Sequence, residues 1–189
     1  MNALKATTIF ITAILLFTPA ILTGQQKDLP PASNKLKPDH APTPFSAKEI
    51  REGCPRDRTM VFQIEVFGKP MMFRTTRFMS HFEDRTVMED ITKMADGKKV
   101  GKTQIITAKW SDLQHHASFP AAKTKITNVK HTVPAGTFDC YLYTVTGTAA
   151  GKTVIKQLYF AKKLPGPPIV YIEKTDGKIT YNMTMIKNK

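Results

Sequence analysis

The chain has 189 residues, enough for one domain with a real hydrophobic core and too few for two full domains. It carries 28 Lys and Arg residues against 15 Asp and Glu residues, a formal net charge of +13. The basic residues occur singly or in pairs and form no polybasic tail, which argues against a nucleic-acid partner. The charge favours contact with a lipid surface or another anionic envelope component, and solubility is the alternative explanation.

The first 24 residues have the pattern of a signal peptide. Lys5 precedes an uncharged, largely apolar run over residues 6–22, and cleavage could follow Ala20 or Gly24. We therefore expect an extracytoplasmic protein, periplasmic or secreted. The alternative is an uncleaved segment that anchors the chain in the membrane. A lipoprotein is not expected, because the first cysteine follows some 30 residues after the leader.

Residues 25–45 are rich in proline and poor in large apolar side chains. This composition predicts a flexible linker, since it offers little surface to bury against the entropy of ordering. Ser46 and Glu49 then match a capping box and predict one helical turn over residues 46–51. The remaining residues, 46–189, are expected to form a single domain.

After residue 58 the apolar residues recur with a period of two, which is typical of strands with one buried face. Asp-Gly pairs at 96–97 and 176–177 predict hairpins, as do the turns at 68–70, 134–137 and 147–152. Residues 111–123 interrupt the pattern and predict a loop or a short helix. The predicted strands cover residues 60–66, 71–78, 86–94, 100–110, 126–133, 138–146, 153–161, 169–173 and 178–186.

This order of strands and turns predicts a mainly β domain. Short turns between consecutive strands favour an antiparallel meander that forms a curved sheet, half-barrel or barrel, with at most one or two short helices. Two turns carry residues of special geometry. Pro134 presets the turn that Gly136 completes, and the bend at Pro165, Gly166 and Pro167 is too rigid for a central strand.

The segment 133–140 reads VPAGTF-x-C and is followed by the strand 158–161 and the proline-rich bend 164–168. This pattern resembles a bacterial exported domain-of-unknown-function family that is distantly similar to the LolA/LolB-like lipoprotein-carrier half-barrels. The resemblance covers residues 125–187. It implies a curved antiparallel sheet whose concave face, in the carriers, accommodates acyl chains. No ligand-contact residue of the carriers matches a numbered position in this chain.

Cys54 and Cys140 are the two cysteines of the chain. In an exported protein a small even number of cysteines predicts a disulfide, and these two would close a long loop. The alternative is two unpaired thiols, one in a loop and one buried in a strand.

No motif for catalysis, metal binding or a cofactor stands out. The adjacent His115 and His116 lack neighbouring ligands other than Asp112, so no metal site is expected. The cluster of acids over residues 83–90 is interpreted as charge that faces solvent. No nucleophile elbow, P-loop or dinucleotide fingerprint occurs in the sequence. We expect a protein without catalytic residues or a cofactor, and not an enzyme.

The leading hypothesis is an extracytoplasmic binding protein that holds a lipid or another amphiphile on the concave face of its sheet. Methionines and aromatic residues suit a greasy groove, although they equally suit an ordinary core. The same hypothesis includes docking on an anionic envelope surface, which would be a peripheral membrane contact. The alternative is a structural or protein-interaction module of the cell envelope, with a filled core and a basic contact surface. These methionines lie at positions 60, 71, 72, 79, 88, 94, 183 and 185.

Overall fold

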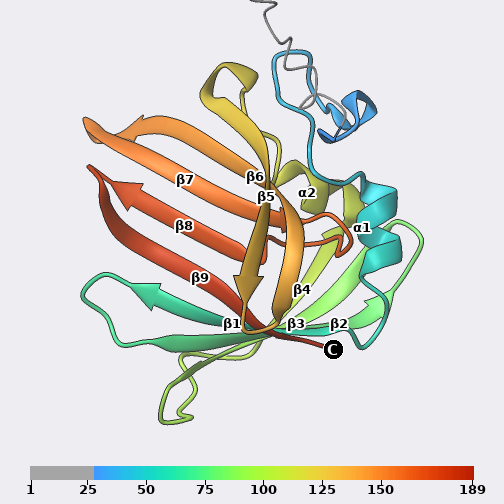
Figure 1. The fold of residues 1–189 in the computed structure, drawn as a ribbon. Coiled ribbons are helices and arrows are strands. Elements are labelled where there is room, and N and C mark those ends of the chain that lie inside the picture. Colours follow the sequence, from blue (N-terminus) through green and yellow to red (C-terminus); the bar gives the residue numbers. More distant parts are fainter. Residues whose placement is uncertain (1–27) are drawn as a thin grey trace, which may run out of the picture.

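The computed structural model describes residues 28–189, so the predicted signal peptide over residues 1–24 lies outside the described part (Figure 1). In this part nine strands form one antiparallel sheet in the order β4-β3-β2-β1-β9-β8-β7-β6-β5. The strands are β1 (Thr59–Val66), β2 (Met72–His81), β3 (Arg85–Met94), β4 (Gln104–Lys109), β5 (Thr124–Val133), β6 (Gly136–Ala149), β7 (Lys152–Ala161), β8 (Val170–Thr175) and β9 (Lys178–Asn188).

The order of the strands shows two meanders that meet in the middle of the sheet. β1 to β4 pair consecutively, as do β5 to β9, and the pairing of β1 with β9 joins the two sets. β4 and β5 are the edges and do not pair with each other, so the sheet curls without closing (Figure 1). The prediction of a mainly β, antiparallel, curved sheet is confirmed.

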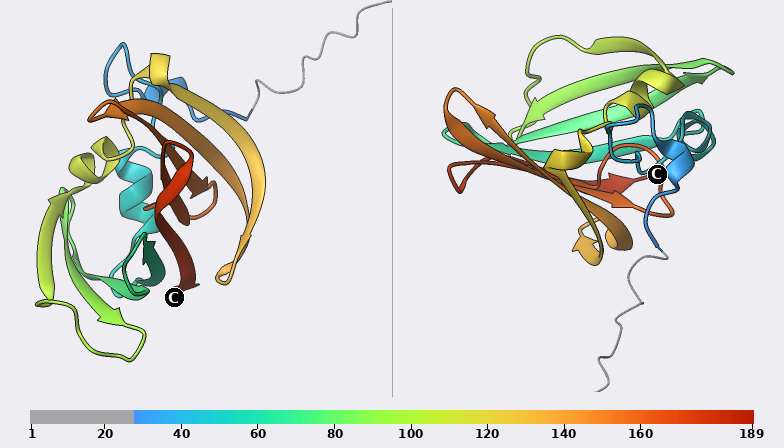
Figure 2. Two further views of the ribbon diagram at one scale, coloured as in Figure 1. Left: turned by 90° about the vertical axis from the view of Figure 1, so that its left-hand side faces the viewer. Right: turned by 90° about the horizontal axis from the view of Figure 1, so that it is seen from above.

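Two short helices lie inside the curve of the sheet. In Figure 2, α1 (Ala47–Gly53) lies between the two halves of the sheet, and α2 (Trp110–His115) follows β4. The predicted capping box is present, because the Ser46 hydroxyl accepts from the Glu49 amide at 3.2 Å and the Ser46 amide donates to the Glu49 carboxylate at 2.7 Å. The predicted helical turn is therefore confirmed. Two 3-10 turns, η1 (Ala32–Asn34) and η2 (Ala121–Lys123), complete the described helices.

Residues 28–45 differ from the flexible linker that the composition predicted. Thr43 has no exposed surface, and its hydroxyl accepts from the Gln114 amide at 3.0 Å. The Tyr143 hydroxyl donates to the Pro42 carbonyl at 2.7 Å, and the Ala41 amide donates to the Phe119 carbonyl at 2.9 Å. The prolines fix φ in advance, and the carbonyls of the segment find donors on the domain, so the segment packs with few large apolar side chains.

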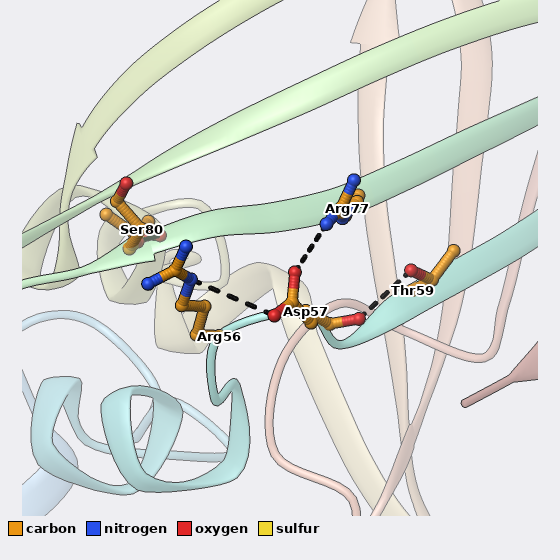
Figure 3. Close-up of polar contacts among 6 residues, drawn as sticks. Arg56, Asp57, Thr59, Arg77 and Ser80 are labelled. Carbon is orange, nitrogen blue, oxygen red and sulfur yellow. Dashed lines mark hydrogen bonds and ion pairs between the residues drawn. The ribbon is translucent and has the colours of Figure 1, made fainter.

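Asp57 holds the turn that precedes β1 through contacts on the surface of the protein. It has a φ of 69° and receives the Arg77 guanidinium at 2.5 Å, while Arg56 lies 3.8 Å away (Figure 3). The Thr59 hydroxyl donates to the Asp57 carbonyl at 3.1 Å. The hydrogen bond from Arg77 lowers the pKa of the Asp57 carboxyl. The contacts of Asp57 with Arg77 and Thr59 hold the turn that leads into Arg58 and β1.

Candidate ligand cavity

Alternation along the strands places one set of side chains on the concave face. Register pairs such as Phe62 with Arg74, Thr76 with Asp90 and Leu158 with Tyr171 carry this face across the sheet. Between the concave face and the two helices lies a cavity of about 460 Å³. Its lining includes Phe45, Ile50, Cys54, Met60, Phe62, Arg74, Thr76, Phe78, Met88, Ile106, Ala108, Leu113, Gln114, His116, Ala117, Leu158, Phe160, Gly166, Tyr171, Tyr181 and Met183.

The inner part of the cavity is apolar. Phe45 from the segment before α1 meets Phe160 of β7 edge to face, with ring centroids 6.3 Å apart. Phe160 also meets the buried Tyr143 at 5.3 Å, which fixes the ring from a second side. Methionines of β1, β3 and β9 supply flexible, polarisable walls. This part of the cavity offers an apolar ligand ordered aromatic walls on one side and adaptable walls on the other.

Two polar side chains of β2, Arg74 and Thr76, line the cavity and pair with an acid on β3. The Arg74 guanidinium donates to the Asp90 carboxylate, and the Thr76 hydroxyl donates to the other oxygen of the same carboxylate. The Asp90 side chain is 9% exposed, whereas that of Arg74 is 40% exposed. The acid is thus buried and paired, while the guanidinium reaches towards solvent. The bond to Asp90 uses one of the guanidinium's five N–H donors.

Next to the polar side chains of β2, two tyrosines line the cavity, Tyr171 on β8 and Tyr181 on β9. Their rings pack with centroids 5.3 Å apart, and the Tyr171 hydroxyl donates to the Glu173 carboxylate at 2.8 Å. Burial raises the pKa of Tyr171, and the bond to Glu173 raises it further. Burial also raises the pKa of Tyr181, which the charge of Arg74 opposes. Both hydroxyls therefore stay protonated at neutral pH and serve as neutral hydrogen-bonding groups.

At the α1 side of the cavity lies a buried arginine that the sequence reading did not identify. Arg58 is 6% exposed and donates through Nη1 to the carbonyls of Gly53 and Pro165, both at 2.6 Å. Its Nε donates to the Asn188 side chain at 3.0 Å. Arg58 thereby ties α1, the 164–168 bend and the end of β9 together. Only the burial of its side chain marks it, and that is a tertiary property.

The two cysteines lie in different surroundings. Cys54, at the end of α1, lines the cavity and receives Arg58 Nη1 at 3.1 Å, while Cys140 lies in β6 opposite Ala161 of β7. Both thiols are free in the structure, so the expected bridge is not formed there. Each thiol instead lies near a carbonyl oxygen, that of Pro165 for Cys54 and that of Phe138 for Cys140. Burial raises the pKa of Cys54 against the opposing charge of Arg58, and raises that of Cys140 to about 11.

The turn residues singled out in the sequence hold two ends of the structure. Pro134 lies in the turn between β5 and β6, where Gly136 has a φ of 140°. Pro165 and Pro167 flank Gly166, which has a φ of 131°. A Cβ on Gly166 would lie 3.2 Å from Cys54 Sγ and 3.3 Å from Arg58 Nη1, so the bend fits closely over that pair.

The described fold and cavity define a class of protein, an open antiparallel half-barrel whose concave face and two short helices enclose a largely apolar cavity. None of the helices within residues 28–189 is long and apolar enough to cross a membrane. Within the same residues, no group of three or more His, Cys, Asp or Glu side chains is placed to hold a metal ion.

The comparisons with known proteins agree with this class at the level of the fold. No family model and no curated protein sequence matches the chain. The fold is similar to that of MucB, solved as a crystal structure in complex with MucA(peri), with a TM-score of 0.51 and 11% identity. The match covers 76% of this chain and 55% of the MucB chain, so this chain spans about half the length of that protein. At this identity the likeness shows the fold alone.

Proposed function

We propose that the protein is an extracytoplasmic binding protein that holds the apolar part of a lipid or another amphiphile in the cavity between the sheet and its two helices. The observation that carries this proposal is the cavity itself. Its volume of about 460 Å³ falls within the range of about 300–1,000 Å³ that is usual for small-molecule sites. A filled core, which the alternative hypothesis requires, would leave no such space.

The distribution of polar groups supports an amphiphile over a wholly apolar ligand. The apolar chain would lie among Phe45, Phe160 and the methionines, and the polar group would lie beside Arg74, Tyr171 and Tyr181. Arg74 can donate further hydrogen bonds without losing its partner Asp90. A ligand bound in this direction leaves no buried charge unpaired.

We propose a binding role without catalysis. The carboxylates near the cavity are already engaged, Asp90 by Arg74 and Thr76, and Glu173 by Tyr171. Each of these acids is held by a side chain of the protein itself, so we assign both a structural role. The predicted signal peptide supports the extracytoplasmic location, which fractionation of expressing cells tests directly.

Native mass spectrometry of the chain, recovered without detergent from the extracytoplasmic fraction, tests the binding proposal. We expect a lipid or other amphiphile to co-purify in near-stoichiometric amount and to be released by denaturing extraction. Ala108→Phe fills the cavity and is expected to abolish this adduct. Thr107→Phe is the matched control, because Thr107 is the exposed neighbour on β4 and its side chain points to the opposite face.

Two results would overturn the proposal. One is a wild-type chain that carries no adduct and takes up no added phospholipid. The other is an adduct that both phenylalanine variants retain equally, which would place the lipid elsewhere. Melting curves of both variants establish that each is folded before the adducts are compared.

The second candidate is a protein-interaction module of the cell envelope. It is favoured by the likeness in fold to MucB, which was solved in complex with the protein MucA(peri), and by the basic charge of this chain. A clean apo mass, together with a stoichiometric protein partner in crosslinked envelope fractions, would favour this candidate over the first.

A further inference from the structure

Four hairpin turns lie along one rim of the half-barrel. Val66 near the end of β1 pairs with Tyr181 near the start of β9, and Met72 at the start of β2 pairs with Met94 at the end of β3. The Thr153 amide of β7 donates to the Asp176 side chain in the turn after β8. The turns after β1, β3, β6 and β8 therefore lie at the same end of the sheet. In Figure 1 the tips of β6–β7, β8–β9 and β1–β2 follow one another down the left, while α1 lies on the opposite side. We call residues 67–71, 95–103, 150–152 and 176–179 the hairpin rim.

Large apolar side chains are exposed on the hairpin rim. Phe67 is 78% exposed and Ile179 is 51% exposed. Phe67 follows the last residue of β1 and Ile179 lies at the start of the neighbouring β9, where the Phe67 amide donates to the Thr180 carbonyl at 3.1 Å. Met71 and Val100, on the same rim, are 37% and 40% exposed. Phe67 and Ile179 thus form an exposed apolar tip that does not contribute to the hydrophobic core of the domain.

The same rim is strongly basic. It carries six lysines and two aspartates, a net charge of +4 (six minus two). Asp96 pairs with Lys98 at 3.2 Å, and Asp176 accepts from the Thr153 amide, so both acids are engaged locally. Apolar tips flanked by lysines are the composition that favours the interface of an anionic bilayer. The exposed lysines of the rim are Lys69, Lys98, Lys99, Lys102, Lys152 and Lys178.

Another exposed phenylalanine shows the contrast. Phe82 is 47% exposed in the β2–β3 turn, at the other end of β2. It is followed by Glu83 and Asp84, and the Arg85 guanidinium lies over its ring at 5.3 Å. Its turn therefore offers no excess of positive charge to an anionic surface. The combination of apolar exposure and positive charge belongs to the rim.

We propose that the hairpin rim docks on a bilayer that contains anionic phospholipid, with Phe67 and Ile179 inserted among the headgroups and the six lysines facing the lipid phosphates. This surface is separate from the cavity, and docking does not depend on a bound ligand. The two are adjacent, however, because the cavity lining reaches Tyr181, whose strand partner Val66 precedes Phe67. Docking would bring the polar side of the cavity towards the membrane surface.

Co-sedimentation of the full chain with vesicles tests the proposal. We expect binding to phosphatidylcholine vesicles that contain phosphatidylglycerol, weaker binding to phosphatidylcholine alone, and a loss of binding as salt is raised. Phe67→Ser and the pair Lys69→Glu with Lys178→Glu should each lower the partition coefficient about tenfold. Phe82→Ser is the matched control and should leave it unchanged. All variants share the same N-terminal segment, so differences among them report the rim.

Tryptophan fluorescence is a second measurement, and it reports which residue inserts even if another part of the chain also binds the vesicle. Phe67→Trp should shift its emission to the blue on anionic vesicles and be quenched by brominated acyl chains, whereas Phe82→Trp should not respond. Equal responses at the two positions would overturn the proposal. So would binding that Phe67→Ser leaves intact while a soluble polyanion abolishes it, because that result indicates an anionic polymer or acidic protein as the partner.

Discussion

Arg58 is the residue on which several elements depend. Its guanidinium joins the carbonyls of Gly53 and Pro165 and the side chain of Asn188 from within the protein. In the sequence it is one basic residue among 28, and nothing in its neighbourhood separates it from Arg56. The burial that gives it this role arises when α1, the bend and β9 come together.

Replacing this arginine tests its role. Arg58→Leu keeps aliphatic volume at this position but removes the guanidinium that donates to the Gly53 and Pro165 carbonyls, so we expect a loss of about 2–3 kcal/mol in the free energy of unfolding. Arg56→Leu, which removes an exposed arginine two residues earlier, should change it by less than about 0.5 kcal/mol. Urea denaturation measures both, and equal effects would contradict the anchoring role.

The raised pKa of Cys140 predicts a dependence of stability on pH. The folded chain holds the thiol proton to about pH 11, whereas the ordinary value is 9.0. The folded state therefore binds this proton more tightly, and the stability it contributes is full below pH 9.0 and is lost as the pH rises towards 11. Cys140→Ala should show a smaller loss across this window in parallel urea titrations. Identical pH profiles for the two chains would contradict a buried, protonated thiol.

At the scale of elements, α1 was predicted from its capping box and its role was not. Ser46 and Glu49 are three positions apart, the local spacing of a capping box, so their pairing can be predicted from the sequence. That the same helix lines a cavity with Ile50 and Cys54 depends on the curvature of a sheet formed by later residues. The strand predicted over 100–110 is shorter at both ends: the turn after β3 continues to residue 103, and Trp110 begins α2, where it packs on Phe78 with ring centroids 6.3 Å apart.

The capping box gives a prediction for this element. Ser46→Ala should lower the free energy of unfolding by about 1 kcal/mol, since the first turn of α1 loses a partner for the Glu49 amide. Ser111→Ala, an exposed serine in the first turn of α2, should have a smaller effect. Urea denaturation compares the two variants, and a larger effect at Ser111 would contradict the assignment of the cap.

At the scale of the whole molecule, the segment before α1 joins the domain. The hydrogen bond from Tyr143 to Pro42 connects residues about 100 positions apart, across the cavity end of the sheet. Tyr143→Phe should lower the free energy of unfolding by about 1 kcal/mol, because the Pro42 carbonyl loses its donor. Tyr159→Phe is the control, since Tyr159 packs on His131 through its ring, with centroids 4.4 Å apart and the ring planes tilted by 35°. Urea denaturation curves of both variants measure the two losses. Equal losses would contradict a specific role of the Tyr143–Pro42 hydrogen bond in holding the segment before α1 on the domain.

The sequence by itself determined the β class, the hairpin turns and the first helix of this protein. These features rest on interactions between residues close in the chain: alternation along a strand, glycine in a turn and a serine beside the first turn of a helix. The tertiary structure alone decided the pairing of β1 with β9, the packing of residues 28–45, the burial of Arg58 and the cavity. Each of these depends on contacts between residues distant in sequence, and the curvature that makes them is a property of the assembled sheet.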